Sequence, residues 1–188
     1  MRILGISGSL RRDSYNTGLL RAAAELAGDG VELELWDGLA TVPPYDADDD
    51  DPAAAPTGVA DLREALAGAD AVLFATPEYN SSIPGQLKNA LDWASRPLAT
   101  NPLRNLPVAV VGASTGMFGA VWAQAELRKV LGAVGARVLD VELACGHAQA
   151  RFDDDGRLVD ADVAVELEAL VEELADAVRG RVEAAAAA

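Results

Sequence analysis

A hydroxyl-rich loop near the start of the chain carries residue types that bind phosphate groups. It lies between an apolar segment ending at Ile6 and a helical run over residues 18–26. Its serine hydroxyls, amide and guanidinium groups belong to Ser7, Ser9, Ser14, Asn16, Arg11 and Arg12. A strand followed by this loop and a helix places these groups at a helix N-terminus, where free N–H groups and the helix dipole attract anions. The alternative is an ordinary turn whose serines cap the helix, but so many hydroxyls beside an arginine favour phosphate.

Two common phosphate loops do not fit this spacing. The dinucleotide fingerprint requires G-x-G-x-x-G, whereas Gly5 and Gly8 are followed by no glycine at the required position. The P-loop ends in Gly-Lys-Ser/Thr, which is absent from the sequence. The sequence therefore predicts a phosphate held mainly by hydroxyls and backbone N–H groups.

Two further polar loops follow strongly apolar segments. Residues 76–85 follow the apolar run 71–75, and prolines stiffen this loop, which displays a tyrosine ring and an asparagine amide. Residues 114–119 follow the apolar run 108–113 and are small, polar and rich in glycine. A stiff loop that displays an aromatic ring and an amide suits a planar ligand.

The hydrophobic pattern alternates between strands and helices along the whole chain. We predict strands over residues 2–6, 31–36, 71–75, 108–113 and 137–143, and helices over 18–26, 59–66, 84–94, 120–134 and 160–179. The alternation implies an α/β fold with a doubly wound, five-stranded parallel sheet and helices on both faces. In the flavodoxin-like strand order 2-1-3-4-5, segment 31–36 is an edge strand. The loops after strands 1, 3 and 4 then converge where such sheets bind ligands.

Length and composition limit the classes of partner. The 188 residues fit a single domain, which we assign to residues 1–179, with a frayed alanine-rich tail over 180–188. A formal net charge of −15 disfavours binding to nucleic acid or to an anionic membrane surface. The apolar runs are too short for a membrane span, no secretion signal is expected, and the single cysteine fits a reducing cytosol. These features predict a cytoplasmic protein.

Two other groups of residues receive a structural interpretation. The acidic run 46–51 lies in a long connection and lacks the ligand spacing of a calcium loop, so we expect a solvated, mobile loop. Cys145 and His147 are close in sequence, as in some metal or activated-thiol sites, but metal sites need three or four ligands. We therefore predict no metal site.

Two motifs resemble those of the NADPH-dependent FMN reductase family, which includes flavin, quinone, chromate and azo reductases. They are G-S-L-R-x-x-S-x-N over residues 8–16 and P-E-Y-N-x-S-x-P-G-x-L-K-N over residues 77–89. The resemblance spans roughly residues 1–175 and implies FMN as cofactor and NADPH, or NADH, as cosubstrate. It also implies a small-molecule acceptor, which is a quinone, a flavin, an azo compound or a metal oxyanion. Because hydride passes through N5 of FMN, no protein side chain is expected to be catalytic.

The resemblance also assigns cofactor-binding residues. Around the phosphate it implies Ser9, Arg11, Ser14, Tyr15 and Asn16; along the isoalloxazine and ribityl chain, Pro77, Glu78, Tyr79 and Asn80; and on the far side of the ring, Ser114, Thr115 and Gly116. The alternatives are purely structural roles: Glu78 caps a helix or pairs with Lys88, Tyr79 is a surface aromatic, and residues 114–116 are only a turn. Ser81 departs from many relatives, which have a larger residue there, and implies a wider or more polar substrate site.

The family resemblance further implies a homodimer, with tetramers also formed, and contact through the helix that begins at Pro84 and the loop before it. Two other functions stay open on sequence grounds. One is a flavodoxin-like FMN electron carrier without its own NADPH site, which the acidic surface would suit. The other is a scaffold that binds no flavin.

Overall fold

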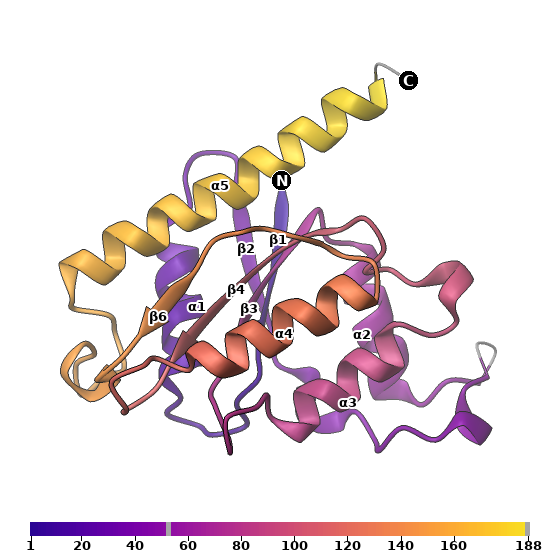
Figure 1. Cartoon of the computed structure of the whole chain (residues 1–188). Helices are drawn as coiled ribbons and strands as arrows, with labels where there is room; N and C mark the ends of the chain where they lie inside the picture. Colours follow the sequence, from indigo (N-terminus) through magenta and orange to yellow (C-terminus); the bar gives the residue numbers. More distant parts are fainter. Residues whose placement is uncertain (52–53, 187–188) are drawn as a thin grey trace.

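A computed structural model describes residues 1–51 and 54–186 of the chain. Strands and helices alternate along the sequence (Figure 1). In chain order they are β1 (Arg2–Ser7), α1 (Tyr15–Leu26), β2 (Glu32–Trp36), α2 (Thr57–Ala67), β3 (Ala71–Ala75), α3 (Gly85–Ala94), β4 (Pro107–Ala113), α4 (Val121–Ala133), β5 (Arg137–Val138), β6 (Leu143–Cys145) and α5 (Ala161–Ala186). Short 3-10 helices lie at Gly38–Thr41, Ala47–Asp49, Leu98–Thr100 and Ala148–Ala150.

The sheet is parallel, and its strand order is β2-β1-β3-β4-β5, with β6 also paired to β4. The predicted doubly wound fold and strand order are confirmed, and β2 is an edge strand. The register brings Ile6 of β1 beside Phe74 of β3, and Phe74 beside Val110 of β4. The carboxyl ends of these strands therefore meet at one edge of the sheet, which we call the carboxyl edge.

The prediction of one strand over residues 137–143 is wrong, because two short strands replace it. β5 pairs Val138 with Val108 of β4, and β6 pairs Leu143 with Val111. Between these two pairs the segment beside β4 advances five residues, from 138 to 143, while β4 itself advances only three, from 108 to 111. The extra residues cannot all pair with β4, so the chain leaves the ladder between β5 and β6.

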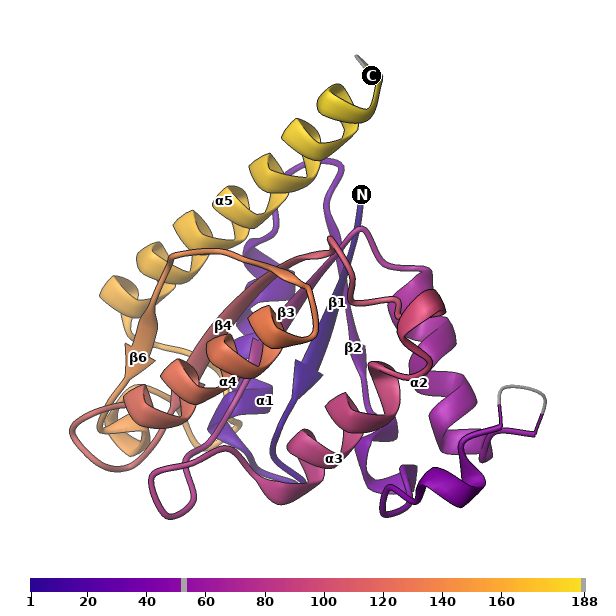
Figure 2. The ribbon, with the colours of Figure 1, turned by 45° about the vertical axis from the view of Figure 1, so that its right-hand side comes forward.

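Helices cover both faces of the sheet. On one face Leu62, Leu87 and Leu127 from α2, α3 and α4 pack in one hydrophobic cluster, and on the other Leu19 of α1 and Leu167 of α5 pack in a second. Figures 1 and 2 show α4 in front of the strands and α1 behind them. The residues of β3 alternate between the two clusters and are all buried, as expected for an uninterrupted apolar strand.

The C-terminal helix is longer than predicted. We expected the helix to end at Arg179, but α5 continues to Ala186 and projects beyond the sheet in Figure 1. The expected fraying of the tail stays a prediction. Alanine is the strongest helix former, so the alanine-rich sequence favours continuation of the helix. Residues 187–188 of the predicted tail lie outside the described residues. None of the described helices has the length and apolar character needed to cross a membrane.

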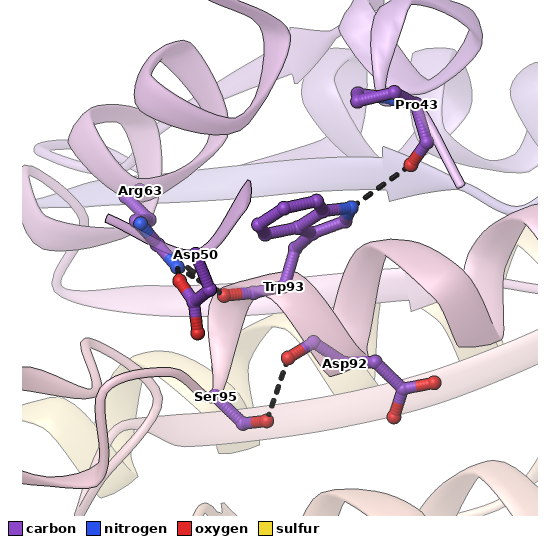
Figure 3. A network of polar contacts seen from close by, with 6 residues as sticks. All are labelled: Pro43, Asp50, Arg63, Asp92, Trp93 and Ser95. Carbon is purple, nitrogen blue, oxygen red and sulfur yellow. Dashed lines mark hydrogen bonds and ion pairs between the residues drawn. The ribbon is translucent and has the colours of Figure 1, made fainter. Parts of the chain in front are cut away.

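The acidic connection after β2 is anchored to the body of the protein at Asp50, which the expectation of a solvated loop did not include, whereas Asp46, Asp48 and Asp49 are exposed as expected. Arg63 of α2 donates to the carboxylate of Asp50 at 2.8 Å and to the backbone oxygen of Trp93 at 2.9 Å (Figure 3). The indole of Trp93 donates to the oxygen of Pro43 at 2.9 Å. The connection is therefore tied to α2 at Asp50 and to α3 at Pro43, which the charge pattern alone did not indicate.

Candidate active site

The loop between β1 and α1 is curled by short-range hydrogen bonds among its hydroxyls. Ser7 Oγ accepts from the N–H of Ser9 at 3.3 Å and from the hydroxyl of Thr17 at 3.0 Å. Ser9 Oγ accepts from the N–H of Arg11 at 3.3 Å. Thr17 was not among the predicted site residues, although a hydroxyl in the first turn of the helix was the signal that could have revealed it.

The start of α1 presents hydrogen-bond donors that no protein group uses. Ser14 occupies the N-cap position and is buried, but its hydroxyl makes no capping hydrogen bond. Within residues 1–51 and 54–186, the N–H groups of Tyr15, Asn16 and Thr17 receive no hydrogen-bond partner. The capped-turn alternative is therefore not what the structure shows. Free hydroxyl and N–H donors at a helix N-terminus fit a phosphate dianion.

Arg11 is the cation placed beside these donors. Its guanidinium lies over the ring of Tyr15, 5.2 Å from the centroid, and this ring packs against Phe152 with centroids 5.3 Å apart. Arg11 is exposed, and among the described ion pairs none involves it. Its charge is thus available to an anion, in a protein whose overall charge would repel one.

Asn16 has a different position from the other predicted phosphate ligands. Its side-chain nitrogen donates to the backbone oxygen of Ala113 at 3.0 Å, and its side-chain oxygen accepts from the N–H of Ala113 at 2.9 Å. The amide is buried, and only one of its two N–H groups remains available to a ligand. The structure therefore gives the Asn16 side chain a role in joining α1 to the end of β4.

The loop after β3 forms a tight two-residue hairpin, which projects at the carboxyl edge in Figure 2. Tyr79 and Ser82 exchange backbone hydrogen bonds of 3.0 and 3.1 Å. Between them Asn80 and Ser81 have φ values of 54° and 60°, the left-handed conformation of a type I′ turn. Asparagine tolerates this conformation better than serine does, so the turn stores strain at Ser81. Tyr79 is exposed at the hairpin, and Pro77 is buried beneath it.

The loop after β4 lies beside this hairpin. Ser114 is half-buried, and Thr115 and Gly116 are exposed. The backbone oxygen of Gly116 accepts from the N–H of His147 at 2.9 Å, which ties this loop to the segment after β6. Residues 114–116 therefore form a turn that is hydrogen-bonded to the segment after β6 and exposed to solvent at Thr115 and Gly116.

Backbone hydrogen bonds tie the first two predicted loops to the carboxyl ends of the neighbouring strands. The N–H of Gly8 donates to the backbone oxygen of Ala75 at 2.8 Å, and the N–H of Thr76 donates to the backbone oxygen of Val111 at 2.9 Å. A Cβ added to Gly8 would lie 2.9 Å from the side chain of Leu87 and 3.4 Å from that of Pro77, so the first two loops touch there. Together with the Asn16 contact described above, these bonds fix the three loops to the carboxyl edge of the sheet, and we call the three loops together the rim.

A cleft of about 270 Å³ lies next to Arg11. It is lined by residues of the first loop and of the segment after β6: Arg11, Asp13, Ser14, Tyr15, Arg21, Gln149, Phe152, Asp153, Asp154, Asp155 and Gly156. The sequence analysis missed the segment 149–156. The signal was its position after the carboxyl end of a strand, because ligands of doubly wound folds bind outside the carboxyl ends of the strands.

Cys145 and His147 do not form an activated pair. Cys145 is buried, and burial raises the pKa of its thiol from the ordinary value of 9.0 to about 11, against a smaller lowering by Arg151. A thiol with this pKa is a weak nucleophile near neutral pH. Among residues 1–51 and 54–186, no group of three or more His, Cys, Asp or Glu side chains is arranged to hold a metal ion.

Comparisons with known proteins show which family and fold this chain resembles. A family model described as NADPH-dependent FMN reductase matches residues 1–150. An NAD(P)H-dependent FMN reductase of Pseudomonas aeruginosa is 45% identical over 161 residues, 85% of each chain. A 2-hydroxy-1,4-benzoquinone reductase of a Burkholderia species is 37% identical over 184 residues, covering 96% of this chain and 98% of the relative.

The fold is likewise similar to that of a solved flavoenzyme. The structure of an NAD(P)H:(acceptor) oxidoreductase from Paracoccus denitrificans superposes with a TM-score of 0.83 at 35% identity. The match covers 95% of this chain and 97% of that protein. Because relatives match over nearly their full length, the likeness extends to every element that builds the carboxyl edge.

Proposed function

The chain belongs to the NADPH-dependent FMN reductase family, and from this premise we propose that it transfers electrons from NADPH to a quinone. It is an oxidoreductase that uses FMN and NAD(P)H. When bound, FMN supplies the hydride and electron transfer, so the chain needs no nucleophile of its own. The observation that carries the proposal is the preformed rim of three loops with unused donors at the start of α1.

The residues of the first loop are suited to the phosphate of FMN. In the proposal Ser9, Arg11 and Ser14 hold it, together with the free N–H groups of Tyr15 and Asn16. The chemistry of this donor set supports the assignment, because it offers hydroxyls, amides and one guanidinium and no competing ion pair within the described residues. The side chain of Asn16 then acts through Ala113.

The other two loops are suited to the ring and the ribityl chain. Pro77, Tyr79 and Asn80 line one side of the proposed site, and residues 114–116 line the other. Glu78, which the sequence analysis grouped with them, has its carboxylate directed to α4. Residues 1–179 then form a single FMN-binding domain, and α5 is its last element.

A quinone is the acceptor class that we favour. The Burkholderia relative that matches nearly the whole chain is named for a benzoquinone substrate. The exposed aromatic rings of Tyr79 and Phe118 lie on loops at the carboxyl edge, and that of Trp122 lies in the first turn of α4, where they offer flat apolar surface to a planar acceptor. Ser81 adds a small polar residue beside them, consistent with a site that accepts a ring bearing oxygen atoms.

We further propose a cytoplasmic homodimer. Met117, Phe118 and Trp122 form an exposed apolar patch of the kind that marks contact surfaces between proteins. This patch adjoins the hairpin that precedes α3, the segment from which the family resemblance predicted the contact. The single, buried cysteine suits a reducing compartment.

Anaerobic mixing of the FMN-loaded protein with NADPH tests the reductase assignment. Loss of the visible flavin absorbance within seconds is expected, and an unchanged spectrum would leave an electron carrier without its own NADPH site. Addition of a benzoquinone should restore the absorbance faster than addition of free FMN, an azo dye or chromate. A slower return with the quinone than with these acceptors would contradict the choice of acceptor. Protein that takes up no FMN would contradict the whole proposal.

A further inference from the structure

The carboxylate of Glu78 reaches from the loop after β3 to the beginning of α4. Its Oε2 atom accepts from the N–H of Trp122 at 3.1 Å and from the N–H of Ala123 at 3.2 Å. Lys88, the alternative partner named from the sequence, pairs with Asp92 instead, at 2.7 Å. Glu78 therefore connects the loop after β3 to the first turn of α4, 44 residues further along the chain.

α4 has no cap of its own. The residue at its N-cap position is Ala120, which has no polar side-chain atom and adopts φ 65°. The first turn of α4 contains no acidic residue, and no other side chain in the described part of the chain accepts from its N–H groups. Since the first turn of a helix leaves N–H groups unpaired at the positive end of the dipole, a carboxylate from elsewhere in the fold stabilises it.

The loop before α4 is fixed to the helix from the other side. Gln124 is fully buried, and its Nε2 donates to the oxygen of Gly119 at 3.0 Å. Gly119 has φ 56°, and a Cβ there would lie 2.3 Å from the backbone of Ala144, so this point of the loop cannot shift freely. Residues 114–120 and the start of α4 thus form one unit, and Glu78 links that unit to the loop after β3.

We infer that Glu78 is a positioning residue for the cofactor: by capping α4 it holds the loop after β3 and the loop after β4 at a fixed separation on which FMN affinity depends. The inference rests on the proposed location of FMN between these loops. In this inference FMN affinity depends on the length of the Glu78 side chain and on the oxygen that accepts the two hydrogen bonds. The negative charge of the carboxylate is not required near the ligand.

Three substitutions separate reach from charge. Glu78→Gln keeps the length and one accepting oxygen but removes the charge. Glu78→Asp keeps the charge but is one methylene shorter, and Glu78→Ala removes both. Glu126→Ala is the matched control, because Glu126 lies in α4 and makes no hydrogen bond or ion pair with the described residues. The FMN dissociation constant is measured by quenching of FMN fluorescence at a temperature well below the melting point of each apoprotein. The circular dichroism of the bound flavin is recorded between 350 and 500 nm.

The expected result is a dissociation constant raised about tenfold or more for Glu78→Asp and Glu78→Ala, with an altered flavin dichroism. Glu78→Gln and the control should stay within about threefold of the wild type. Equal weakening by the Gln and Ala variants would show that FMN binding needs the negative charge of Glu78 rather than its reach and its accepting oxygen, and would overturn the inference. Wild-type affinity in the Asp and Ala variants would also overturn it, because the link would then serve stability alone. If the wild type itself failed to bind FMN, the proposed function would fail before this inference was reached.

Discussion

The side-chain amide of Asn16 pairs with the backbone of Ala113 through two hydrogen bonds, of 3.0 and 2.9 Å. Asn16 lies in the first turn of α1, and Ala113 is the last residue of β4. β3 lies between β1 and β4 in the sheet, so this contact crosses over the end of one strand. It joins the predicted phosphate loop to the predicted ring loop independently of any ligand.

Replacing Asn16 with alanine should destabilise the protein by about 2 to 4 kcal/mol, because both polar groups of Ala113 would lose their buried partner. Urea unfolding of the apoprotein measures this loss. Asn16→Asp provides a second test, since a carboxylate accepts from the N–H of Ala113 but cannot donate to its oxygen. Gln149→Ala, at an exposed position where no side-chain hydrogen bond is found among the described residues, is the control for loss of an amide. A change of less than about 0.5 kcal/mol in Asn16→Ala would contradict the role given to this contact.

Arg11→Ala should weaken FMN binding by about 1.5 to 3 kcal/mol, the range for a hydrogen bond to a charged group. The dissociation constant would then rise about ten- to a hundredfold, as measured by fluorescence titration. Arg12→Ala, at the neighbouring exposed position, removes the same charge and is the control. Added salt should reduce the difference between wild type and Arg11→Ala by screening the guanidinium. Equal effects of the two substitutions would show that Arg11 acts only through the general field.

The ion pair between Arg63 and Asp50 should make the acidic connection contribute to the stability of the fold (Figure 3). Their side chains are only 17% and 13% exposed, so Asp50→Asn should destabilise the fold by about 1 to 2 kcal/mol. Asp48→Asn, which removes an equal charge from the same segment, should leave the free energy of unfolding nearly unchanged. Both substitutions should leave turnover nearly unaltered, because the segment lies apart from the three loops of the rim. Equal stability of the two variants would contradict the anchoring described above.

Burial of Cys145 makes stability depend on pH in the alkaline range. The thiol has a pKa of about 11 in the folded protein and an ordinary value of 9.0 when unfolded, so the folded state retains the proton longer. The resulting stabilisation is complete below about pH 9 and is lost as the pH rises towards 11, by about 1.4 kcal/mol for each pH unit. Urea unfolding of wild type and Cys145→Ala at several pH values measures the difference in slope. Parallel curves between pH 9 and 11 would show that the thiol is not protected by burial.

The sequence determined the architecture because each element carried its own local signal. The buried strands read as uninterrupted apolar runs at residues 71–75 and 108–113, and the helices showed apolar stripes at helical spacing. With the alternation of strands and helices, these signals led to the correct strand order, to the family, and to the three loops that meet at the carboxyl edge.

The tertiary structure decided which partner each polar side chain of those loops uses. Asn16 pairs with Ala113, and Glu78 caps α4, although the motif grouped both with ligands of the cofactor. Asp50 is tied to Arg63, although its neighbours made it look solvated. Such contacts join residues far apart in sequence, and their geometry depends on how the strands are stacked side by side. A local pattern specifies that a polar group is present, whereas only the assembled sheet fixes which donor or acceptor lies within 3 Å of it.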